Sequence, residues 1–218
     1  MPQKGRMAMP HTVQKLTNVY LQPIFPPDFG IFVCNCPKRE VDVAHYFNLG
    51  FFAKTETGTI PVGNLADSGI IYSQSKDNPD WINVAKKPLT TIYVKNDARF
   101  GITKTDRLDT IQDLKTAVSG IPVLKDKKPV TMEEIRQEGY FGNELSKTWH
   151  GFLGIRGSEL VYAAFHCDFE SMPWVLLSLG MESAVKLDGG GSFVLWDESE
   201  VAGTAENRVI NNVGMWSL

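Results

Sequence analysis

The stretch Val185-Lys186-Leu187-Asp188-Gly189-Gly190-Gly191-Ser192-Phe193-Val194-Leu195-Trp196 places an acid, three glycines and a hydroxyl between two apolar runs. Both runs are rich in residues that favour strands, so one strand is expected to enter the glycines and another to leave them. Three glycines in a row indicate positive φ or a close approach to the backbone, because glycine has the largest entropic cost of ordering. The stretch is therefore either a glycine hairpin between two core strands or a turn whose N–H groups hold an anion.

Length and composition are those of an ordinary globular protein. The 218 residues allow one substantial core, and 43% of them are hydrophobic and 22% charged. The net charge of −3 does not favour nucleic acid or an anionic membrane as a partner. The first ten residues do not resemble a signal peptide, and no apolar run is long enough to span a membrane. We therefore predict a protein that is cytoplasmic as synthesised, and its three cysteines suit a reducing compartment.

The pattern of apolar residues predicts an α+β fold: a single domain with a mixed β-sheet and a few short helices packed on it. Residues 1–40, rich in proline, are expected to form an irregular N-terminal segment that includes strands at 19–24 and 30–34, and residues 41–218 to form the domain. Helices are expected at 110–119, from a capping box at Thr131 to Gly139, and at 171–179, where apolar residues lie nearly all round. The other strands are expected at 69–73, 90–94, 99–103, 151–155, 159–165, 184–187, 193–196 and 208–216.

Six short segments, taken in order, carry a resemblance to a known family. They are Asn48-Leu49-Gly50-Phe51-Phe52, Pro61-Val62-Gly63, Ser119-Gly120-Ile121-Pro122-Val123-Leu124, Lys147-Thr148-Trp149-His150-Gly151, Leu187-Asp188-Gly189-Gly190-Gly191-Ser192 and Glu206-Asn207-Arg208-Val209-Ile210-Asn211-Asn212-Val213. Together they resemble the phosphodiester glycosidase domain family, which has bacterial and phage members. Two positions depart from its pattern: Leu49 stands where the family has glycine, and Lys147 where it has arginine. Lysine keeps the charge but cannot form a bidentate fork with phosphate.

The resemblance implies a hydrolase that cleaves a sugar from a phosphodiester, such as a glycan phosphate or a teichoic-acid-like substrate. This reaction needs an acid or base at the glycosidic centre and donors that hold the phosphate. Asp188 is the candidate that activates water or stabilises the oxocarbenium-like centre, although it could also cap the turn as an Asx residue. Lys147 would supply positive charge, and the substrate-binding candidates in these motifs are Thr148, Gly189, Gly190, Gly191 and Ser192.

Further candidates have a structural alternative that the sequence leaves open. His150 and His166 fall on neighbouring strands and could act as general acids, or be satisfied core residues. A second carboxylate would be Asp168 or Glu182, which the sequence does not separate.

Two further substrate-binding candidates, Asn48 and Arg208, also have structural alternatives. Asn48 could bind a sugar or hold a loop, and Arg208 could pair with Asp188, with phosphate or within the sheet. No metal-ligand spacing stands out, so we predict no metal and no cofactor.

The departures at Leu49 and Lys147 also allow a non-catalytic protein that binds a glycan or phosphodiester on the same fold. A structural subunit of a larger assembly is a third interpretation. Surface glycans lie outside the cell, so release of a phage-encoded protein by lysis, or its transport in a virion, would bring it to such a substrate. The oligomeric state stays open.

Overall fold

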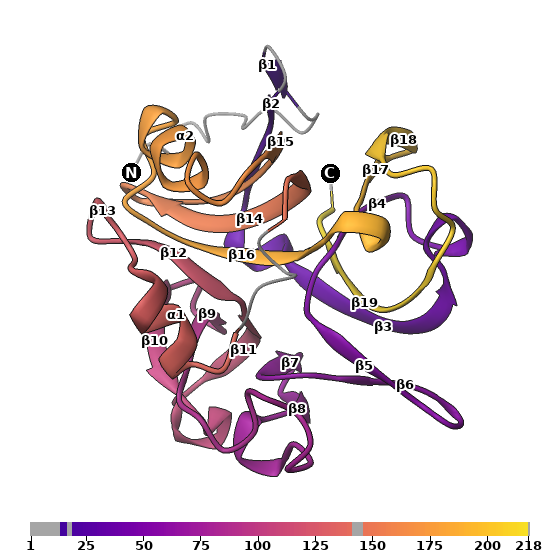
Figure 1. The fold of residues 1–218 in the computed structure, drawn as a ribbon, viewed down its shortest axis with the longest axis vertical. Coiled ribbons are helices and arrows are strands. Elements are labelled where there is room, and N and C mark those ends of the chain that lie inside the picture. The colour runs from indigo at the N-terminus through magenta and orange to yellow at the C-terminus, as the bar shows by residue number, and fades with distance from the viewer. Residues whose placement is uncertain (1–13, 17–18, 141–145, 218) are drawn as a thin grey trace, which may run out of the picture.

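The computed structural model describes residues 14–16, 19–140 and 146–217, and within them the chain forms three large sheets and one hairpin (Figure 1). The seven-stranded sheet has the order β1-β2-β15-β14-β16-β12-β13, with the bounds Gln14–Leu16, Val19–Ile24, Glu159–Cys167, Thr148–Arg156, Ser183–Gly189, Ile121–Lys125 and Lys128–Pro129. A five-stranded sheet has the order β10-β9-β11-β7-β8, with the bounds Phe100–Thr105, Leu89–Lys95, Leu114–Ser119, Leu65–Asp67 and Ile70–Ser73. A second five-stranded sheet has the order β18-β17-β4-β19-β3, with the bounds Ser199–Gly203, Val194–Asp197, His45–Asn48, Val209–Met215 and Gly30–Pro37. The hairpin consists of β5, Phe52–Thr55, and β6, Gly58–Pro61.

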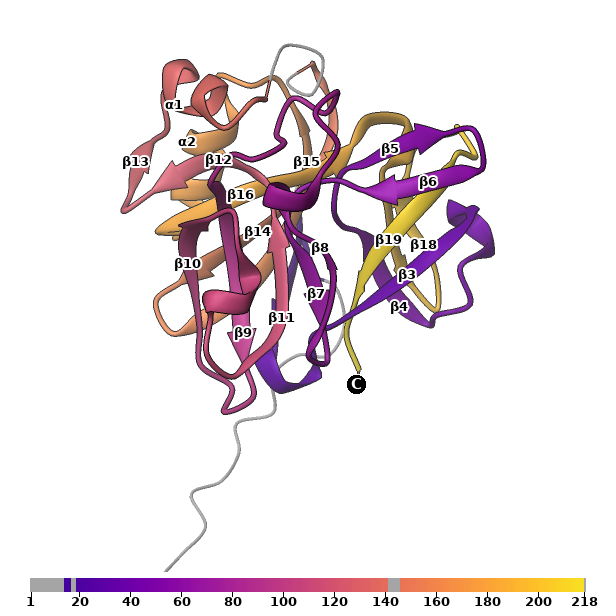
Figure 2. The same cartoon turned by 90° about the horizontal axis from the view of Figure 1, so that it is seen from below.

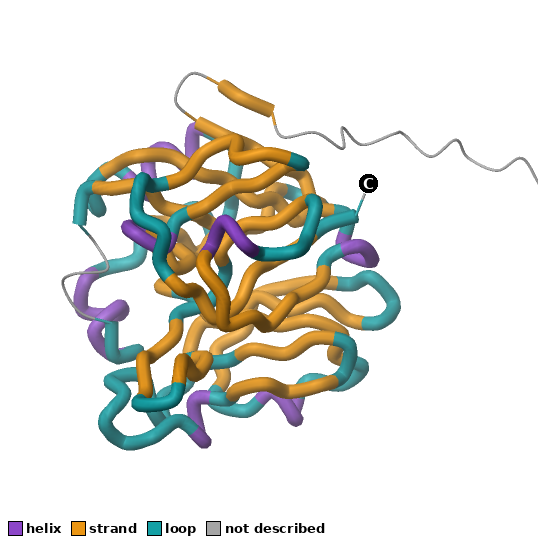
Figure 3. Tube along the Cα trace, turned by 90° about the vertical axis from the view of Figure 1, so that its right-hand side faces the viewer, coloured by secondary structure: helices purple, strands orange, loops and turns teal. Residues whose placement is uncertain are grey.

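The predicted α+β fold with a mixed sheet is wrong, because the molecule is a β-rich structure. Strands account for 51% of it and helices for 14%, and the sheets are antiparallel. Strands dominate the tube in Figure 3. The described residues contain two α-helices, α1, Met132–Gln137, and α2, Met172–Ser178, and α2 lies on the outer side of the seven-stranded sheet in Figure 1.

The helix expected at 110–119 is the main local error. Its second half is β11, which pairs with β9 on one side and β7 on the other. Residues 116–119 are buried one after another, as in a central strand covered on both faces, so no alternation distinguishes them from a helical pattern. Hydrogen bonding to a strand on each side therefore determines the conformation of this segment, although a few of its apolar residues have helical spacing.

Both other expected helices are present. The capping box at Thr131 is confirmed, because the Thr131 hydroxyl accepts from the N–H of Glu134 and the Glu134 carboxylate accepts from the N–H of Thr131. The helix α2 is also confirmed, but its indole at Trp174 is 64% exposed, so the expectation of burial all round is wrong for that face. The ten expected strands are present, with ends that differ by up to three residues. No helix among the described residues is long and apolar enough to cross a membrane.

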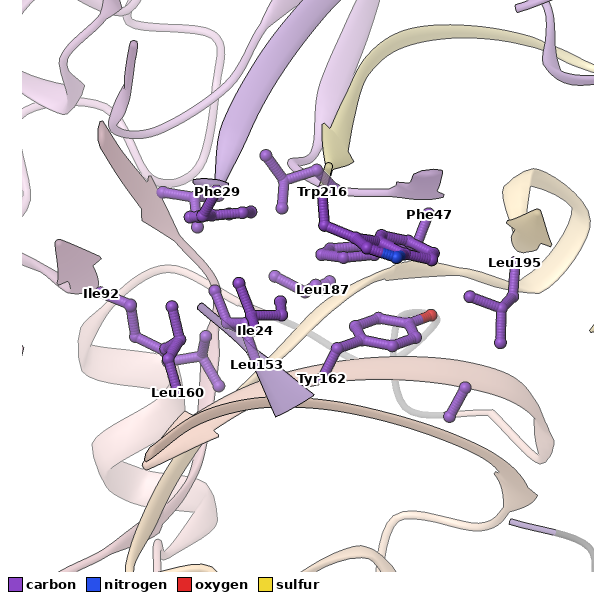
Figure 4. Close-up of a cluster of buried hydrophobic side chains, with 14 of the residues drawn as sticks. Ile24, Phe29, Phe47, Ile92, Leu153, Leu160, Tyr162, Leu187, Leu195 and Trp216 are labelled. Carbon is purple, nitrogen blue, oxygen red and sulfur yellow. The ribbon is translucent and has the colours of Figure 1, made fainter. Parts of the chain in front are cut away.

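The core lies where the three large sheets face one another. Figure 4 shows Phe47 of β4 between Trp216 and Tyr162, and the rings of Phe47 and Tyr162 stack with centroids 3.9 Å apart. Leu187 of β16 points into the same cluster. Two strands of the first forty residues belong to this framework, since β2 pairs with β15 and β3 with β19.

The glycine turn is the passage of the chain from one sheet to another. β16 lies inside the seven-stranded sheet, between β14 and β12, whereas β17 pairs with β4 and β18. A single 3-10 turn, Gly190–Ser192, joins the two strands. The turn is therefore not a hairpin, and it lies at the junction of two sheets (Figure 1).

Candidate functional site

The candidate site is built around Asp188, the last residue but one of β16. Alternation along the strand places Lys186 and Asp188 on one face and Val185 and Leu187 on the other, in the core. The N–H of Asp188 donates to the carbonyl of Leu49 at 3.0 Å, and its carbonyl accepts from Nδ2 of Asn48 at 2.6 Å. A main-chain contact from Leu49 and a side-chain contact from Asn48 thus hold the backbone of Asp188 in place.

The environment of Asp188 favours its protonated form. The residue is partly buried, and burial raises the pKa of Asp188 to about 6. The Lys186 ammonium, the N–H of Gly189, the Ser192 hydroxyl and the Arg208 guanidinium act in the opposite direction. The N–H of Gly189 lies 2.9 Å from Oδ1 of Asp188. A carboxyl group with a pKa near 6 can exchange a proton at neutral pH, as an acid or base in catalysis must.

Lys186 is the cation that accompanies this carboxyl group. It is 1% exposed, and its Nζ donates to the carbonyl of Leu187 at 3.0 Å and lies 5.1 Å from the centroid of the Phe51 ring. Lysines are almost never fully buried unless paired, so burial beside Asp188 points to an electrostatic role. Sequence reasoning missed Lys186, although a charged residue within an apolar strand was a visible signal.

His150 of β14 stands beside β16, in register with Gly189. Burial, and then the Lys186 charge, lower the pKa of His150 to about 3, so the ring is neutral at pH 7. Its Nε2 lies 2.8 Å from the carbonyl of Ser146, and since a carbonyl only accepts, the proton of the neutral ring is on Nε2. Nδ1 is then an acceptor, and it is buried with no hydrogen-bond partner among the described residues.

A small residue is required where β14 passes the end of β16. A Cβ on Gly189 would lie 2.8 Å from the carbonyl oxygen of Trp149 and 3.2 Å from Nδ1 of His150. The first contact is with the main chain, which cannot shift without a large cost in free energy. Gly189 thus lets His150 approach the Asp188 end of the strand closely.

A second buried lysine, Lys38, holds the turn itself. Lys38 is fully buried, and its three N–H groups share four acceptors: the carbonyls of Gly191, Phe193 and Thr204, at 3.1, 3.2 and 2.9 Å from Nζ, and Oγ1 of Thr204, at 2.5 Å. Burial lowers its pKa, and Arg39 adds to that effect. Because the N–H of a trans peptide points opposite to its C=O, the N–H of Ser192 is turned away from Lys38. Sequence reasoning missed Lys38, which is more than 150 residues from the turn and in a segment expected to be irregular.

Asn48 serves the same turn from the other side. Its Nδ2 donates to Asp188, its Oδ1 accepts from the N–H of Val194 at 3.3 Å, and the side chain is 1% exposed. Both amide atoms are engaged across the turn, which matches the loop-holding alternative for this residue. Asn212 of β19, which the sequence did not single out, supports this segment, because its Oδ1 accepts from the N–H of Gly50 at 2.6 Å.

Two other candidates border the turn on its outer side. Thr148 is the neighbour of Gly190, since its Cγ2 would lie 3.9 Å from a Cβ built there. Arg208 is exposed and pairs with Glu206, with Nε and Oε2 2.6 Å apart, and this pair covers Gly191. Arg208 still acts on Asp188 through its charge, as the pKa of that carboxyl group shows.

The structure does not bring the remaining candidates to Asp188. Lys147 is exposed at the start of β14, where its charge helps to lower the pKa of Asp168, after the hydrogen bonds from Ser171. His166 is exposed and contacts the edge of the Trp149 ring. Asp168 accepts from the N–H and hydroxyl of Ser171 at the start of α2. Glu182 precedes β16 at the opposite end and pairs with Lys127 at 3.0 Å.

Comparison with solved structures finds this fold elsewhere. The chain is similar to the catalytic domain of zebrafish N-acetylglucosamine-1-phosphodiester alpha-N-acetylglucosaminidase, described as auto-inhibited by its pro-peptide. The TM-score is 0.73 at 14% identity, and the match covers 98% of this chain and 85% of that one.

Two bacterial structures share the fold more loosely. A hypothetical protein from Synechocystis matches with a TM-score of 0.61 at 11% identity, over 94% of this chain and 60% of that one. A putative exported protein from Burkholderia pseudomallei matches with a TM-score of 0.62 at 11% identity, over 92% and 74%. No family model and no curated protein matches the sequence. At these identities the likeness shows only a distant relationship of fold, and one of the three matched proteins is a glycosidase.

Proposed function

We propose that this chain is a hydrolase that cleaves a sugar from a phosphodiester at the anomeric carbon. The observation that carries the proposal is Asp188, a carboxyl group with a pKa of about 6, beside the buried ammonium of Lys186. The similarity of nearly the whole chain to the catalytic domain of a phosphodiester glycosidase supports it. The glycine turn that follows Asp188 places main-chain atoms close to this carboxyl group.

The proposed reaction is a hydrolysis that consumes one water molecule. A water oxygen bonds to the anomeric carbon, and the bond from that carbon to the phosphate oxygen breaks with its electron pair left on the phosphate. Asp188 accepts the proton of the attacking water and passes it to solvent, and the products are the free sugar and a phosphomonoester. Phosphate is a good leaving group, so placing the water and stabilising charge matter more than protonating the oxygen.

Lys186 and His150 have supporting roles in this scheme. With a pKa of about 6, most of the Asp188 population is ionised at pH 7, and the Lys186 charge favours this form because it lowers the pKa that burial raises. His150 is neutral, and its Nδ1 is a buried acceptor that packs against Gly189, so we assign it a positioning role at the end of β16.

The test is a turnover assay on N-acetylglucosamine 1-phosphate methyl ester, UDP-N-acetylglucosamine and teichoic-acid fragments, with release of the free sugar as the readout. Wild type is compared with Asp188→Asn and with Asp168→Asn, a matched change at an exposed carboxylate. We expect turnover in wild type and Asp168→Asn, and a loss of at least about 100-fold in Asp188→Asn. Thermal shifts with these esters but no turnover in any variant would instead indicate a binding protein. Turnover that survives in Asp188→Asn would refute the assignment of Asp188.

A second measurement examines the role of Lys186. Because its charge lowers the pKa of Asp188, Lys186→Met should move the acidic limb of the kcat/KM profile to higher pH. A limb that stays in place, in a variant with a native circular dichroism spectrum, would separate Lys186 from the chemistry.

A further inference from the structure

An aromatic cleft shares one wall residue, Phe51, with the surroundings of Lys186. Its volume is about 230 Å³, and its walls include Phe51, Phe52, Trp81 and Tyr140. These residues come from the β4–β5 connection, β5, the β8–β9 connection and the segment after α1. Figure 2 shows α1 and the β5–β6 hairpin on the same side of the molecule, with the β8–β9 connection between them. Phe51, Trp81 and Tyr140, from three separate segments, thus line one small space, while the Phe52 side chain packs on the other side against Cys34, Val41 and Tyr46.

Phe51 is a wall shared by the cleft and the candidate site. The Lys186 ammonium lies 5.1 Å from the centroid of its ring, and that ring also lines the cleft, where it contacts Tyr140 with centroids 5.6 Å apart. Phe51 follows Leu49, whose carbonyl accepts from the N–H of Asp188, by two residues. Two residues span at most about 7 Å, so Phe51 links the wall of the cleft to the strand end that holds Asp188.

Trp81 stands at the rim of the cleft on a connection that is firmly held. The indole is 61% exposed, whereas Ile82 and Val84 on its C-terminal side are 8% and 4% exposed and pack in the core. The N–H of Ile82 donates to the carbonyl of Pro79 at 2.9 Å. On the other side, Gly139 packs so closely that an added Cβ would lie 2.2 Å from the carbonyl oxygen of Asn83. The protein thus holds a large apolar ring in solvent on a fixed backbone, which lowers the entropic cost of stacking a ligand on it.

We propose that this cleft is the sugar subsite of the hydrolytic site, with Trp81 as the stacking platform and Phe51 as the wall toward the reacting bond. The inference rests on the proposed function and names the part of the substrate that the cleft takes. The C–H face of a sugar ring is apolar and its rim is polar, which suits a half-open aromatic cleft. The volume is below the roughly 300–1,000 Å³ of pockets for drug-sized ligands, so one ring fits better than a long chain. The phosphate then faces Lys186 and Asp188.

The experiment compares Trp81→Ala and Trp81→Phe with Trp174→Ala, which removes an equally exposed indole from α2. Dissociation constants are measured by calorimetry for N-acetylglucosamine 1-phosphate methyl ester and for methyl phosphate, and KM and kcat for the first. We expect Trp81→Ala to raise both Kd and KM for the sugar ester about tenfold, the size of other stacking contacts on aromatic side chains, with kcat within twofold of wild type. Trp81→Phe should retain most of the affinity, and Trp174→Ala all of it. Binding of methyl phosphate should not change.

The outcomes separate this inference from the proposed function. Weaker binding of the sugar ester by Trp81→Ala, in a protein that hydrolyses none of the esters, would support the subsite and refute the hydrolase. Turnover with a Kd and KM that Trp81→Ala leaves unchanged would refute the subsite alone. An equal loss of methyl phosphate binding would also overturn it, because the cleft would then hold the phosphate. A wild-type dimer that Trp81→Ala converts to a monomer in sedimentation would identify a second copy of the chain as the occupant and overturn it as well.

Discussion

Replacing Asp188 with asparagine should stabilise the protein at neutral pH, by an amount that depends on pH. The pKa of Asp188 is raised from 3.8 to about 6, so the native state holds a proton that the unfolded chain releases between these values. Ionising this partly buried group therefore destabilises the fold as pH rises from about 4 to above 6. A shift of about two pKa units at about 1.4 kcal/mol each corresponds to roughly 3 kcal/mol. Asparagine has the same shape, its oxygen can still accept from the N–H of Gly189, and it never ionises.

The assay is urea unfolding of wild type and Asp188→Asn at intervals between pH 4 and pH 8, followed by tryptophan fluorescence. The difference in free energy of unfolding, variant minus wild type, should be smallest at pH 4 and grow by roughly 3 kcal/mol by pH 8. Asp168→Asn is the matched control, for which this difference in free energy of unfolding should change with pH in the opposite direction. Hydrogen bonds from Ser171 lower the pKa of Asp168, so this variant should lose stability relative to wild type as pH rises through the ordinary carboxyl range. A flat difference for Asp188→Asn, or a fall with pH, would refute the raised pKa and the acid–base role built on it.

Three further predictions concern the surroundings of the turn. Lys38→Met removes the donor to three carbonyls and should lower the free energy of unfolding by about 3 kcal/mol or more. Lys147→Met, at an exposed position, should change it by less than about 0.5 kcal/mol in the same urea assay. Similar values for the two variants would refute the role of Lys38 in holding the turn. The added Cβ of Gly189→Ala would lie 2.8 Å from backbone, so this variant should lower the free energy of unfolding by about 1–3 kcal/mol. Gly191→Ala meets only the ends of the exposed Glu206–Arg208 pair, so its loss of stability should be smaller. A lower melting temperature for Gly191→Ala than for Gly189→Ala would contradict this. The imidazole of His150 has a pKa of about 3, so its NMR signals should not titrate between pH 8 and pH 5, and a midpoint near 6.5 would show that the ring is solvated.

The strands were more predictable than the way they associate. Apolar runs such as 159–165 and 209–215 are bounded by turn residues, and local pattern is enough to find them. Whether they pair in parallel or antiparallel fashion depends on contacts far apart in sequence, such as β2 with β15 and β3 with β19. The segment 114–119 shows the limit, because a strand buried on both faces loses the alternation that separates it from a helix. The α+β prediction failed because antiparallel pairing across three large sheets, set by contacts far apart in sequence, replaces the expected single mixed sheet.

The candidate site divides in the same way. Asp188 and the glycines after it were found because they are consecutive and their composition is unusual. Lys186 was in the same stretch, but its place beside Asp188 follows only from the strand register, which puts both on one face of β16. Lys38 is beyond local reasoning, since a hydrogen bond between residues more than 150 positions apart has no sequence signal.

Two buried lysines supply positive charge near the turn, where the exposed Lys147 replaces the arginine of the family pattern. One cation, Lys186, acts on the Asp188 carboxyl group, and the other, Lys38, fixes the direction of the turn's carbonyls. Each ammonium is removed from water and held by backbone oxygens, so its position is set by the fold and not by a flexible surface side chain. A surface lysine at 147 would lose side-chain entropy on binding an anion, whereas the fold already orders Lys186 and Lys38. Positive charge inside the sheet junction therefore supports the negatively charged ester that we propose as the substrate.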